Sequence, residues 1–252
     1  MLKLTNILVT LNKDSPLQRQ VLSNLNLEIK HGEFVIIIGS NGCGKSTLFN
    51  TISGYIQPDS GQIFIDERQV AGHSQSEFSK DVAIVMQDPR VGTMENMTIE
   101  ENLSFAYLRG SRRKLRFHNT PARRKFFKEK LALLEMNLEN RLDDLVVHLS
   151  GGQRQALSLI MAIVANYKIL LLDEITAALD PKTAENVISI AAKLVKIEKR
   201  TAIMITHNMH HALEYGHKTL IMAGGKIVQE YQIHDKLGLK PADLVGAIEL
   251  YS

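Results

Sequence analysis

The stretch that decides the fold is Gly39-Ser40-Asn41-Gly42-Cys43-Gly44-Lys45-Ser46-Thr47, which lies between the apolar runs 34–38 and 48–52. This order is that of a buried strand, a glycine-rich turn and a helix start, and the spacing Gly-x4-Gly-Lys-Ser is that of a phosphate-binding loop. Its glycines let successive backbone N–H groups point at phosphate oxygens, and the helix adds the positive end of its dipole. We therefore predict that Lys45 reaches the β- and γ-phosphates of a nucleotide and that the Ser46 hydroxyl binds Mg²⁺. The alternative is a chance match in an ordinary turn, which arises in roughly 1% of chains this long.

Composition narrows the class of protein. The chain has 252 residues, 44% of them hydrophobic and 23% charged, as in an ordinary globular protein with a large core. A net charge of +3 does not by itself indicate a nucleic-acid partner, and a single cysteine excludes an internal disulfide and suits a reducing compartment. Residues 1–12 lack a signal-peptide pattern, and the most apolar helical stretch, 156–165, is far shorter than the roughly 20 residues that span a bilayer. We expect a soluble or peripheral protein.

Apolar and alternating segments predict the strands. Residues 1–33 alternate in places around a turn at 14–16, which indicates short antiparallel strands, and 62–66 alternates like an edge strand. Apolar buried strands are expected at 82–86, 169–173, 202–206 and 220–222, with Gly224-Gly225 forming a hairpin into 226–228. Because these strands alternate with helical patterns, the sequence predicts an α/β fold with a parallel sheet and helices on both faces.

Capping motifs predict the helices. Residues 98–101, Thr-Ile-Glu-Glu, form a capping box, Pro121 starts a helix towards Met136, and Asp180-Pro181 opens a helix to about Ile197. We expect a mostly helical lobe at about 90–165, inserted into a core formed by 1–89 and 166–252. Within this lobe, residues 109–130 contain ten Lys or Arg and one acid. A solvated helical face is the favoured interpretation, and nucleic-acid binding is the least favoured, because the aromatic pattern of RNA-binding modules is missing.

Two acids end the apolar strand 169–173. Ligands bind beyond the carboxyl ends of strands in open α/β sheets, so Asp173 and Glu174 are placed to serve the phosphate site. Asp173 can hold Mg²⁺ through water, and Glu174 can accept a proton from an attacking water. The alternative is a pair of helix-capping acids, which the upstream phosphate loop disfavours.

A second helix start contains paired glycines, in Leu149-Ser150-Gly151-Gly152-Gln153. Ser150 is the expected N-cap, and the glycines expose the first amides of the helix, which forms a second anion-binding terminus. An ordinary capped helix is the alternative. Paired glycines weaken a helix, and they are expected where something must approach closely.

These motifs resemble the ATP-binding-cassette (ABC) ATPases along essentially the whole chain. The order matches: the loop at 39–47, Gln87 at a strand end, the signature at 149–153, the acidic strand end, and His207 ending another strand. The resemblance implies one ABC ATPase domain over 1–252, with a P-loop NTPase (RecA-like) core, an antiparallel β-subdomain and a helical subdomain. It is most similar to the stand-alone ATPase subunits of bacterial solute importers.

The resemblance also implies the roles of the site residues. Two copies pair head to tail, and each ATP lies between Lys45 of one copy and the signature of the other, at Ser150, Gly151, Gly152 and Gln153. Gln87 senses Mg²⁺, which Ser46 and Asp173 also bind. Glu174 and His207 act with Lys45 in catalysis, and His207 contacts the γ-phosphate. Asp180 belongs to the loop that crosses the dimer axis.

The function implied is ATP hydrolysis, dependent on Mg²⁺, that drives solute uptake through separate permease subunits together with a solute-binding protein. The chain then lies at the cytoplasmic face of the inner membrane, where the basic segment 109–130 gains a third interpretation, attraction to the inner leaflet. Similarity of 97–103 and 173–184 to a subgroup of importers suggests an amino-acid-like solute. The alternatives are a soluble cassette ATPase acting on nucleic acid or the ribosome, and a nucleotide sensor without catalysis.

Three residues depart from the pattern or stand out within it. Family members usually stack adenine on an aromatic near the N-terminus, whereas residues 1–33 contain none, and Leu11 is our candidate for that position. An aliphatic surface stacks the base more weakly. Ile175 replaces a common proline with little effect expected on the chemistry. Cys43 is either a small packing residue or a thiol activated at a helix N-terminus, which thiol labelling with and without ATP distinguishes.

Overall fold

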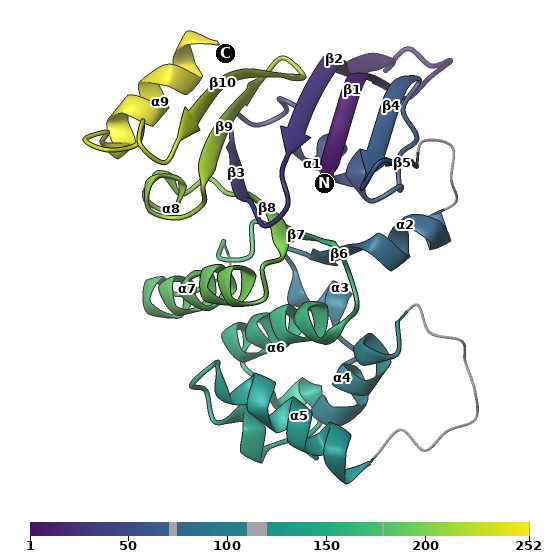
Figure 1. Ribbon diagram of the computed structural model, residues 1–252, viewed down its shortest axis with the longest axis vertical. Helices are drawn as coiled ribbons and strands as arrows, with labels where there is room; N and C mark the ends of the chain where they lie inside the picture. Colours follow the sequence, from purple (N-terminus) through teal and green to yellow (C-terminus); the bar gives the residue numbers. More distant parts are fainter. Residues whose placement is uncertain (71–74, 110–119, 178, 252) are drawn as a thin grey trace.

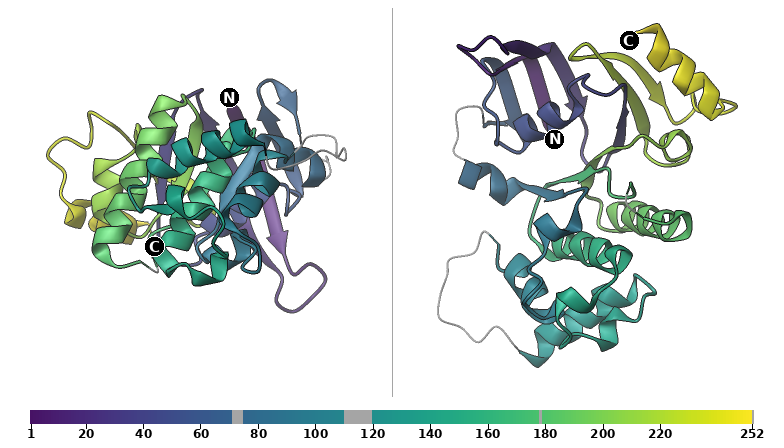
Figure 2. Two further views of the ribbon diagram at one scale, coloured as in Figure 1. Left: turned by 90° about the horizontal axis from the view of Figure 1, so that it is seen from below. Right: turned by 180° about the vertical axis from the view of Figure 1, so that it is seen from behind.

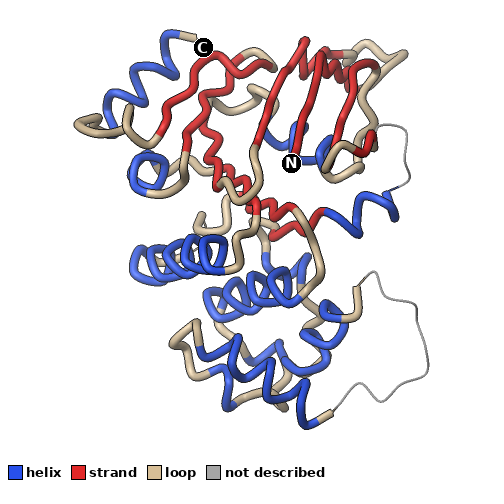
Figure 3. The backbone as a smooth tube through the Cα atoms, in the orientation of Figure 1, coloured by secondary structure: helices blue, strands red, loops and turns tan. Residues whose placement is uncertain are grey.

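The computed structural model describes residues 1–70, 75–109, 120–177 and 179–251. Within these residues the strands form two sheets, a four-stranded sheet of order β2-β1-β4-β5 and a six-stranded sheet of order β10-β9-β3-β8-β7-β6 (Figures 1 and 3). The helices α4, α5 and α6 lie together at the opposite end of the molecule from the four-stranded sheet (Figure 1).

The six-stranded sheet is the centre of the molecule. Its parallel strands are β3 (Phe34–Ile38), β6 (Val82–Val85), β7 (Ile169–Asp173), β8 (Thr201–Ile205) and β9 (Lys218–Ala223), and β10 (Lys226–Gln232) pairs antiparallel with β9. All five residues of β3 are buried, because apolar layers cover both faces of the sheet. The carboxyl ends of β3, β6, β7 and β8 meet at one edge, so the loops that follow them are brought together.

The four-stranded sheet covers one face of the larger one. It consists of β1 (Leu2–Leu11), β2 (Arg19–Ile29), β4 (Ser60–Ile65) and β5 (Arg68–Gln69), and its inward residues pack with α1 (Lys45–Ile52) in one apolar cluster. The expectation of helices on both faces is met on this face by α1, beside which the antiparallel sheet lies. Alternating strands have one apolar face, and here that face is buried against the core. The prediction of 62–66 as an edge strand is wrong, because β4 lies between β1 and β5.

Helices cover the other face. The apolar side of α6 (Gly151–Val164) and of α7 (Pro181–Ile197) belongs to a second core cluster, to which α8 (Met209–Glu214) and α9 (Pro241–Leu250) also contribute. Figure 2 shows from behind that α6 and α7 lie side by side, as their contacts confirm. The predicted helix from Asp180-Pro181 to Ile197 is confirmed, with Asp180 as its N-cap.

The predicted helical segment contains α3 (Pro89–Gly92), α4 (Ile99–Tyr107), α5 (Pro121–Ala132) and two short 3₁₀ turns, Leu138–Asn140 and Val146–His148, before α6; α2 (Gln75–Asp81) precedes it. The Thr98 capping box is confirmed, with the hydroxyl accepting from the Glu101 N–H. Helix α5 stops at Ala132, short of the expected Met136, because Glu135 and Asn137 adopt positive φ.

The basic segment 109–130 is described in part. Its residues 110–119, and with them four of its ten cations, lie outside the described residues. Of the rest, Arg124 bonds both Glu100 and Asp143, and Lys130 pairs with Glu198 on the core side. Part of this segment therefore holds the helical lobe together and to the core. In the described part of the chain, no helix is both long and apolar enough to cross a membrane.

Candidate functional site

The phosphate loop joins β3 to α1 as predicted. A Cβ on Gly39 would lie 2.2 Å from the carbonyl oxygen of Met222, so only glycine lets the loop leave the strand this closely. Gly44 is the N-cap of α1 at φ 109°, and no side chain caps the helix. The first amides of α1 therefore remain free to bind an anion.

Lys45 is held beneath this loop. Its side-chain Nζ donates to the carbonyl oxygens of Gly39 at 2.9 Å and Ser40 at 3.0 Å, and only 6% of the residue is exposed. Two of the three ammonium N–H groups bond these carbonyls and the third points to the Cys43 sulfur, a weak acceptor, so the cation is fixed at the loop. Cys43 is equally buried, with its Sγ 3.8 Å from Nζ. Its position favours the packing role over a reactive thiol.

A hollow of about 490 Å³ opens over the loop. One wall is apolar and comes from the first two strands, with Leu11, Leu17 and Val21; Arg19 stands beside them and its guanidinium lies 3.4 Å from the Gly42 carbonyl oxygen. The other side is formed by 41–47, and Glu174 and His207 complete the lining. Leu11 is therefore where the base of a nucleotide would lie. Leu17 and Val21 were not identified from the sequence as part of this wall. The turn at 14–16 does predict the register of β1 and β2 that pairs Leu11 with Arg19.

The acidic end of β7 faces this hollow. Burial raises the pKa of the half-buried Asp173 carboxyl above its usual value, and the charge of Glu174 raises it further, while Lys45 and His207 lower it. Glu174 adopts φ 47°, in the left-handed region, and its N–H donates to the Ile205 carbonyl at 3.1 Å. A backbone held in this region by its neighbours is frequent at functional sites.

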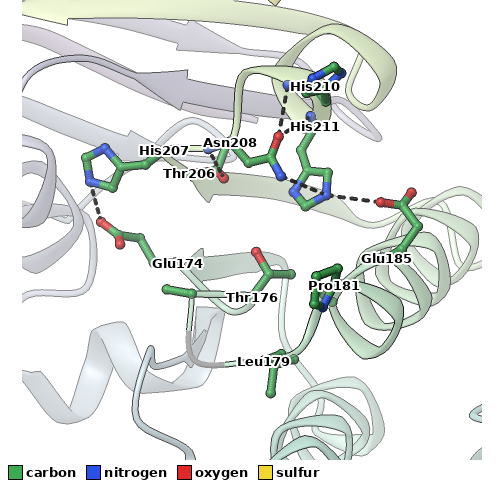
Figure 4. Close-up of a pocket in the computed structure, with 12 residues that line it drawn as sticks. Glu174, Thr176, Leu179, Pro181, Glu185, Thr206, His207, Asn208, His210 and His211 are labelled. Carbon is green, nitrogen blue, oxygen red and sulfur yellow. Dashed lines mark hydrogen bonds and ion pairs between the residues drawn. The ribbon is translucent and has the colours of Figure 1, made fainter.

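Glu174 and His207 meet directly. The Nε2 atom of His207 lies 2.9 Å from Oε1 of Glu174, and the two side chains point toward one another from the ends of β7 and β8 (Figure 4). Both also line a second hollow of about 610 Å³, between the 174–180 loop and the starts of α7 and α8. The pair therefore stands between two cavities, one over the phosphate loop and one towards α7.

The signature at 149–153 is an exposed helix start. Ser150 caps α6: its Oγ accepts from the Gln153 N–H at 3.2 Å, and Gln153 Oε1 accepts from the Ser150 N–H at 3.1 Å. Gly151 is exposed, and a Cβ there would meet nothing within 4 Å. A Cβ on Gly152 would lie 2.6 Å from the Thr183 methyl, so what approaches this glycine is helix α7. The signature contributes no residue to either hollow.

Two further predicted site residues lie apart from the phosphate hollow. Gln87 is exposed, two residues beyond β6, at the same sheet edge as Asp173 but not in the lining of the hollow. Asp180 accepts from the Thr183 N–H at 3.1 Å as the cap of α7, and hydrogen bonds from Thr183, first that of its side chain and then that of its N–H, lower the pKa of the Asp180 carboxyl. The structure thus gathers the phosphate loop, Glu174 and His207, and leaves the signature and Asp180 on the outside.

The donors available near the loop suit Mg²⁺. No cluster of three or more His, Cys, Asp or Glu side chains that could hold a metal occurs in 1–70, 75–109, 120–177 or 179–251. Magnesium is instead commonly held by one or two protein oxygens together with substrate phosphates and water. The Ser46 hydroxyl at the start of α1 and the Asp173 carboxylate are such oxygens, and the charge of Lys45 acts on Asp173. The residues present therefore fit a magnesium ion bound with a nucleotide.

Known proteins match the chain along nearly its whole length. The family model described as ABC transporter matches residues 22–177. A tyrosine transport ATP-binding protein of Clostridioides difficile is 42% identical over 232 residues, which cover 91% of both chains. The choline transport ATP-binding protein OpuBA of Bacillus subtilis is 33% identical over 211 residues, which cover 84% of this chain and 53% of that one.

Solved structures agree with the fold. A dimeric, post-hydrolysis ATP-binding cassette bound to ADP and Pi matches with a TM-score of 0.79 and 30% identity, covering 92% of this chain and 99% of the other. An ATP-binding cassette of an ABC transporter in its ADP conformation matches with a TM-score of 0.81 and covers all of this chain, at 23% identity. The latter supports the fold alone.

Proposed function

The chain belongs to the ABC transporter family as an ATP-binding, ATP-hydrolysing subunit, and we propose that it drives uptake of a small, amino-acid-like solute through separate membrane subunits. The observation that carries the catalytic part of this proposal is the placement of the Glu174–His207 pair, 2.9 Å apart, at the rim of the phosphate hollow. The transport part is supported by relatives whose names state tyrosine and choline transport.

Each residue at the hollow has a defined task in this proposal. Lys45 and the amides at the start of α1 hold the β- and γ-phosphates, because both present N–H groups in a buried pocket. Glu174 accepts a proton from the attacking water, and His207 holds Glu174 and contacts the γ-phosphate. Ser46, Asp173 and Gln87 would hold Mg²⁺, which neutralises charge that develops on the phosphates.

The site is completed by a second copy of the chain. Because the signature is exposed and lines neither hollow, its free amides at Gly151 and Gly152 cannot serve the phosphate loop of the same chain in this arrangement. We place them against the nucleotide of a partner copy, which makes an isologous pair with two equivalent sites. The dimeric cassette that matches this chain supports the arrangement.

Replacing the base tests the catalytic part. Glu174→Gln keeps the size and the hydrogen-bonding oxygen but cannot take a proton, so we expect ATP binding to persist, a dimer to accumulate and turnover to fall by about 10²–10⁴-fold. Phosphate release measures turnover, and gel filtration with ATP measures the dimer. Wild-type phosphate release by this variant would remove Glu174 from the mechanism.

Copurification tests the transport part. The tagged protein is captured from native membranes solubilised in detergent, and ATPase activity is assayed in the eluate. We expect a multi-span permease and a solute-binding protein with it, which also places the chain at the cytoplasmic face of the membrane. Capture of RNA or DNA in their place would support the alternative, a cassette ATPase acting on nucleic acid. That result would overturn the transport assignment and leave the ATPase chemistry intact.

A further inference from the structure

Helix α8 begins two residues after His207, and helix α7 begins seven residues after Glu174. The loop from Glu174 leads into α7 at Pro181, and His207 is followed at once by Asn208, the N-cap of α8. Any shift between these two helices therefore changes how Glu174 and His207 meet. A second contact between the helices would fix that geometry independently of the nucleotide.

Such a contact exists one turn into each helix. On α7, Glu185 Oε1 accepts from the Tyr215 hydroxyl at 2.5 Å, and its Oε2 lies 3.2 Å from Nε2 of His211 on α8 (Figure 4). These hydrogen bonds, first that of Tyr215 and then that of His211, lower the pKa of the Glu185 carboxyl. The His211 and Tyr215 rings pack edge to face, with centroids 6.0 Å apart.

His211 is held from one side only. Its side chain is 5% exposed, and its Nδ1 is a buried atom with no hydrogen-bond partner among the described residues. Its Nε2 faces both the Glu185 carboxylate and, at 3.4 Å, the amide nitrogen of Asn208. Because a carboxylate only accepts, the hydrogen bond to Glu185 requires the proton on Nε2, and the Asn208 amide nitrogen, itself a donor, is then a neighbour of the ring and not its hydrogen-bond partner.

The ring stands against the cap that follows His207. The Asn208 Oδ1 atom accepts from the N–H groups of His210 and His211, at 2.9 and 3.2 Å, and so fixes the first turn of α8. The other end of α8 is held by Lys236, whose Nζ donates to the Tyr215 and Gly216 carbonyls. With both ends of α8 held, the Glu185 contact is what ties its first turn to α7.

We propose that Glu185 and His211 are positioning residues that hold α8 against α7 and thereby aim His207 at Glu174 and the γ-phosphate. Glu185 and His211 line the second hollow and not the one over the phosphate loop, so in this proposal their effect reaches the reaction through His207. A buried polar atom left without a partner is rare in native structures, and the role of holding α8 against α7 accounts for a histidine at this position. This inference rests on the proposed roles of Glu174 and His207.

The test uses the full-length protein and separates turnover from nucleotide binding. For Glu185→Gln and His211→Phe we expect kcat to fall by about 2- to 30-fold, the range of couplings carried by residues that contact neither ligand. The KM for ATP should stay within about twofold, because the phosphate loop is untouched. Tyr215→Phe removes one of the two hydrogen bonds to Glu185 and should give a smaller loss in kcat. His210→Gln is the matched control, since this histidine is its exposed neighbour, and it should leave kcat unchanged.

A mutant cycle with His207→Ala decides the route. If the pair acts through His207, His211→Phe should cost nothing further in the residual activity of His207→Ala, so the effects are not additive. Additive losses, an unchanged kcat in both Glu185→Gln and Tyr215→Phe, or a loss shared by His210→Gln would overturn the inference. Wild-type turnover in His207→Ala and Glu174→Gln would instead reject the proposed site, so the two failures are distinguishable.

Discussion

The two glycine-rich helix starts of this chain, at α1 and at α6, look alike in the sequence and differ in the structure. At α1 no side chain caps the helix, and the loop carries a buried lysine inside a hollow of about 490 Å³. At α6 Ser150 and Gln153 satisfy each other, Gly151 is exposed, and the signature lines neither of the two hollows described above. The α1 terminus lies in a pocket, and the α6 terminus lies on the exposed surface.

This difference shows which part of an anion site each terminus supplies. The capping box at α6 uses the N–H of Gln153, so only the amides of Gly151 and Gly152 remain free at the first turn. Two amides without a wall or a cation bind an anion weakly on their own. We therefore expect the α1 terminus to bind a nucleotide alone and the α6 terminus to contribute only when another surface brings the phosphate to it.

Lys45→Ala should produce the largest change, because it removes the buried lysine that distinguishes the α1 terminus from the α6 terminus. The buried ammonium donates to two loop carbonyls and is the cation of the site. We expect nucleotide binding and turnover to fall by about 10²–10³-fold, the scale of losing a preorganised charged donor. Binding is measured with a fluorescent ATP analogue, and Lys128→Ala, on the exposed surface of α5, is the control. Unchanged binding in Lys45→Ala would mean that the two termini do not differ in the way described.

Gly151→Asp should separate the two termini by function. A Cβ fits there without contact, so the variant should fold, but its carboxylate repels a phosphate. We expect nucleotide binding by the isolated chain to be unchanged, and ATP-dependent dimerisation and turnover to fall by about 10²-fold. The matched control is Gly246→Asp, a helical glycine in α9 with equally open surroundings. Loss of nucleotide binding by the monomer would show that α6 serves its own chain.

Gly152→Ala should lower the stability of the fold, whereas the neighbouring substitution Gly151→Ala should not. The new Cβ meets the Thr183 methyl at 2.6 Å, and overpacking costs about 1–3 kcal/mol, of which helix propensity returns about 1. We expect a lower melting temperature for Gly152→Ala, rescue by Thr183→Ser, which removes the methyl, and a slightly higher melting temperature for Gly151→Ala. A double variant that melts no higher than Gly152→Ala would exclude the Thr183 contact as the cause.

Leu11→Tyr should give the smallest change, and only at the α1 site. An aromatic ring in this wall of the hollow would stack on the base, and stacking is worth about 1–3 kcal/mol per base. We expect ATP to bind about fivefold more tightly, a change at the low end of that range. Inhibition by inorganic triphosphate, which has no base, should not change. An equal gain for triphosphate would mean that the substitution acts on the loop and not on the base.

Much of the fold was predictable because local signals decide it. The phosphate loop, the acidic strand end and the caps at Thr98, Ser150 and Asp180 each depend on neighbours within a few residues, and the structure has these elements at the predicted positions. The face that the antiparallel strands cover was not predictable in the same way. Which face the first strands cover depends on pairing between β1 and β4, about 50 residues apart, and the local pattern does not state that partner.

The candidate site was predictable to a similar depth. Glu174, His207 and the loop were named from motif order, and the structure brings them together. The apolar wall at Leu17 and Val21 and the Glu185–His211 contact were missed, since both arise from side chains that meet only after hairpin pairing or helix packing. The second glycine of the signature was attributed to a close approach, and the structure identifies α7 as what approaches.

The left-handed backbone of Glu174 places the proposed catalytic base at the site and lowers the stability of the fold. A non-glycine residue at φ 47° costs about 1–2 kcal/mol, which glycine does not incur. Glu174→Gly should therefore melt above Glu174→Gln, although neither turns over ATP. Selection of a variant library for heat resistance alone would favour replacement of Glu174 and so loss of the proposed base. Selection for turnover would retain Glu174 together with the lower stability that its backbone conformation causes.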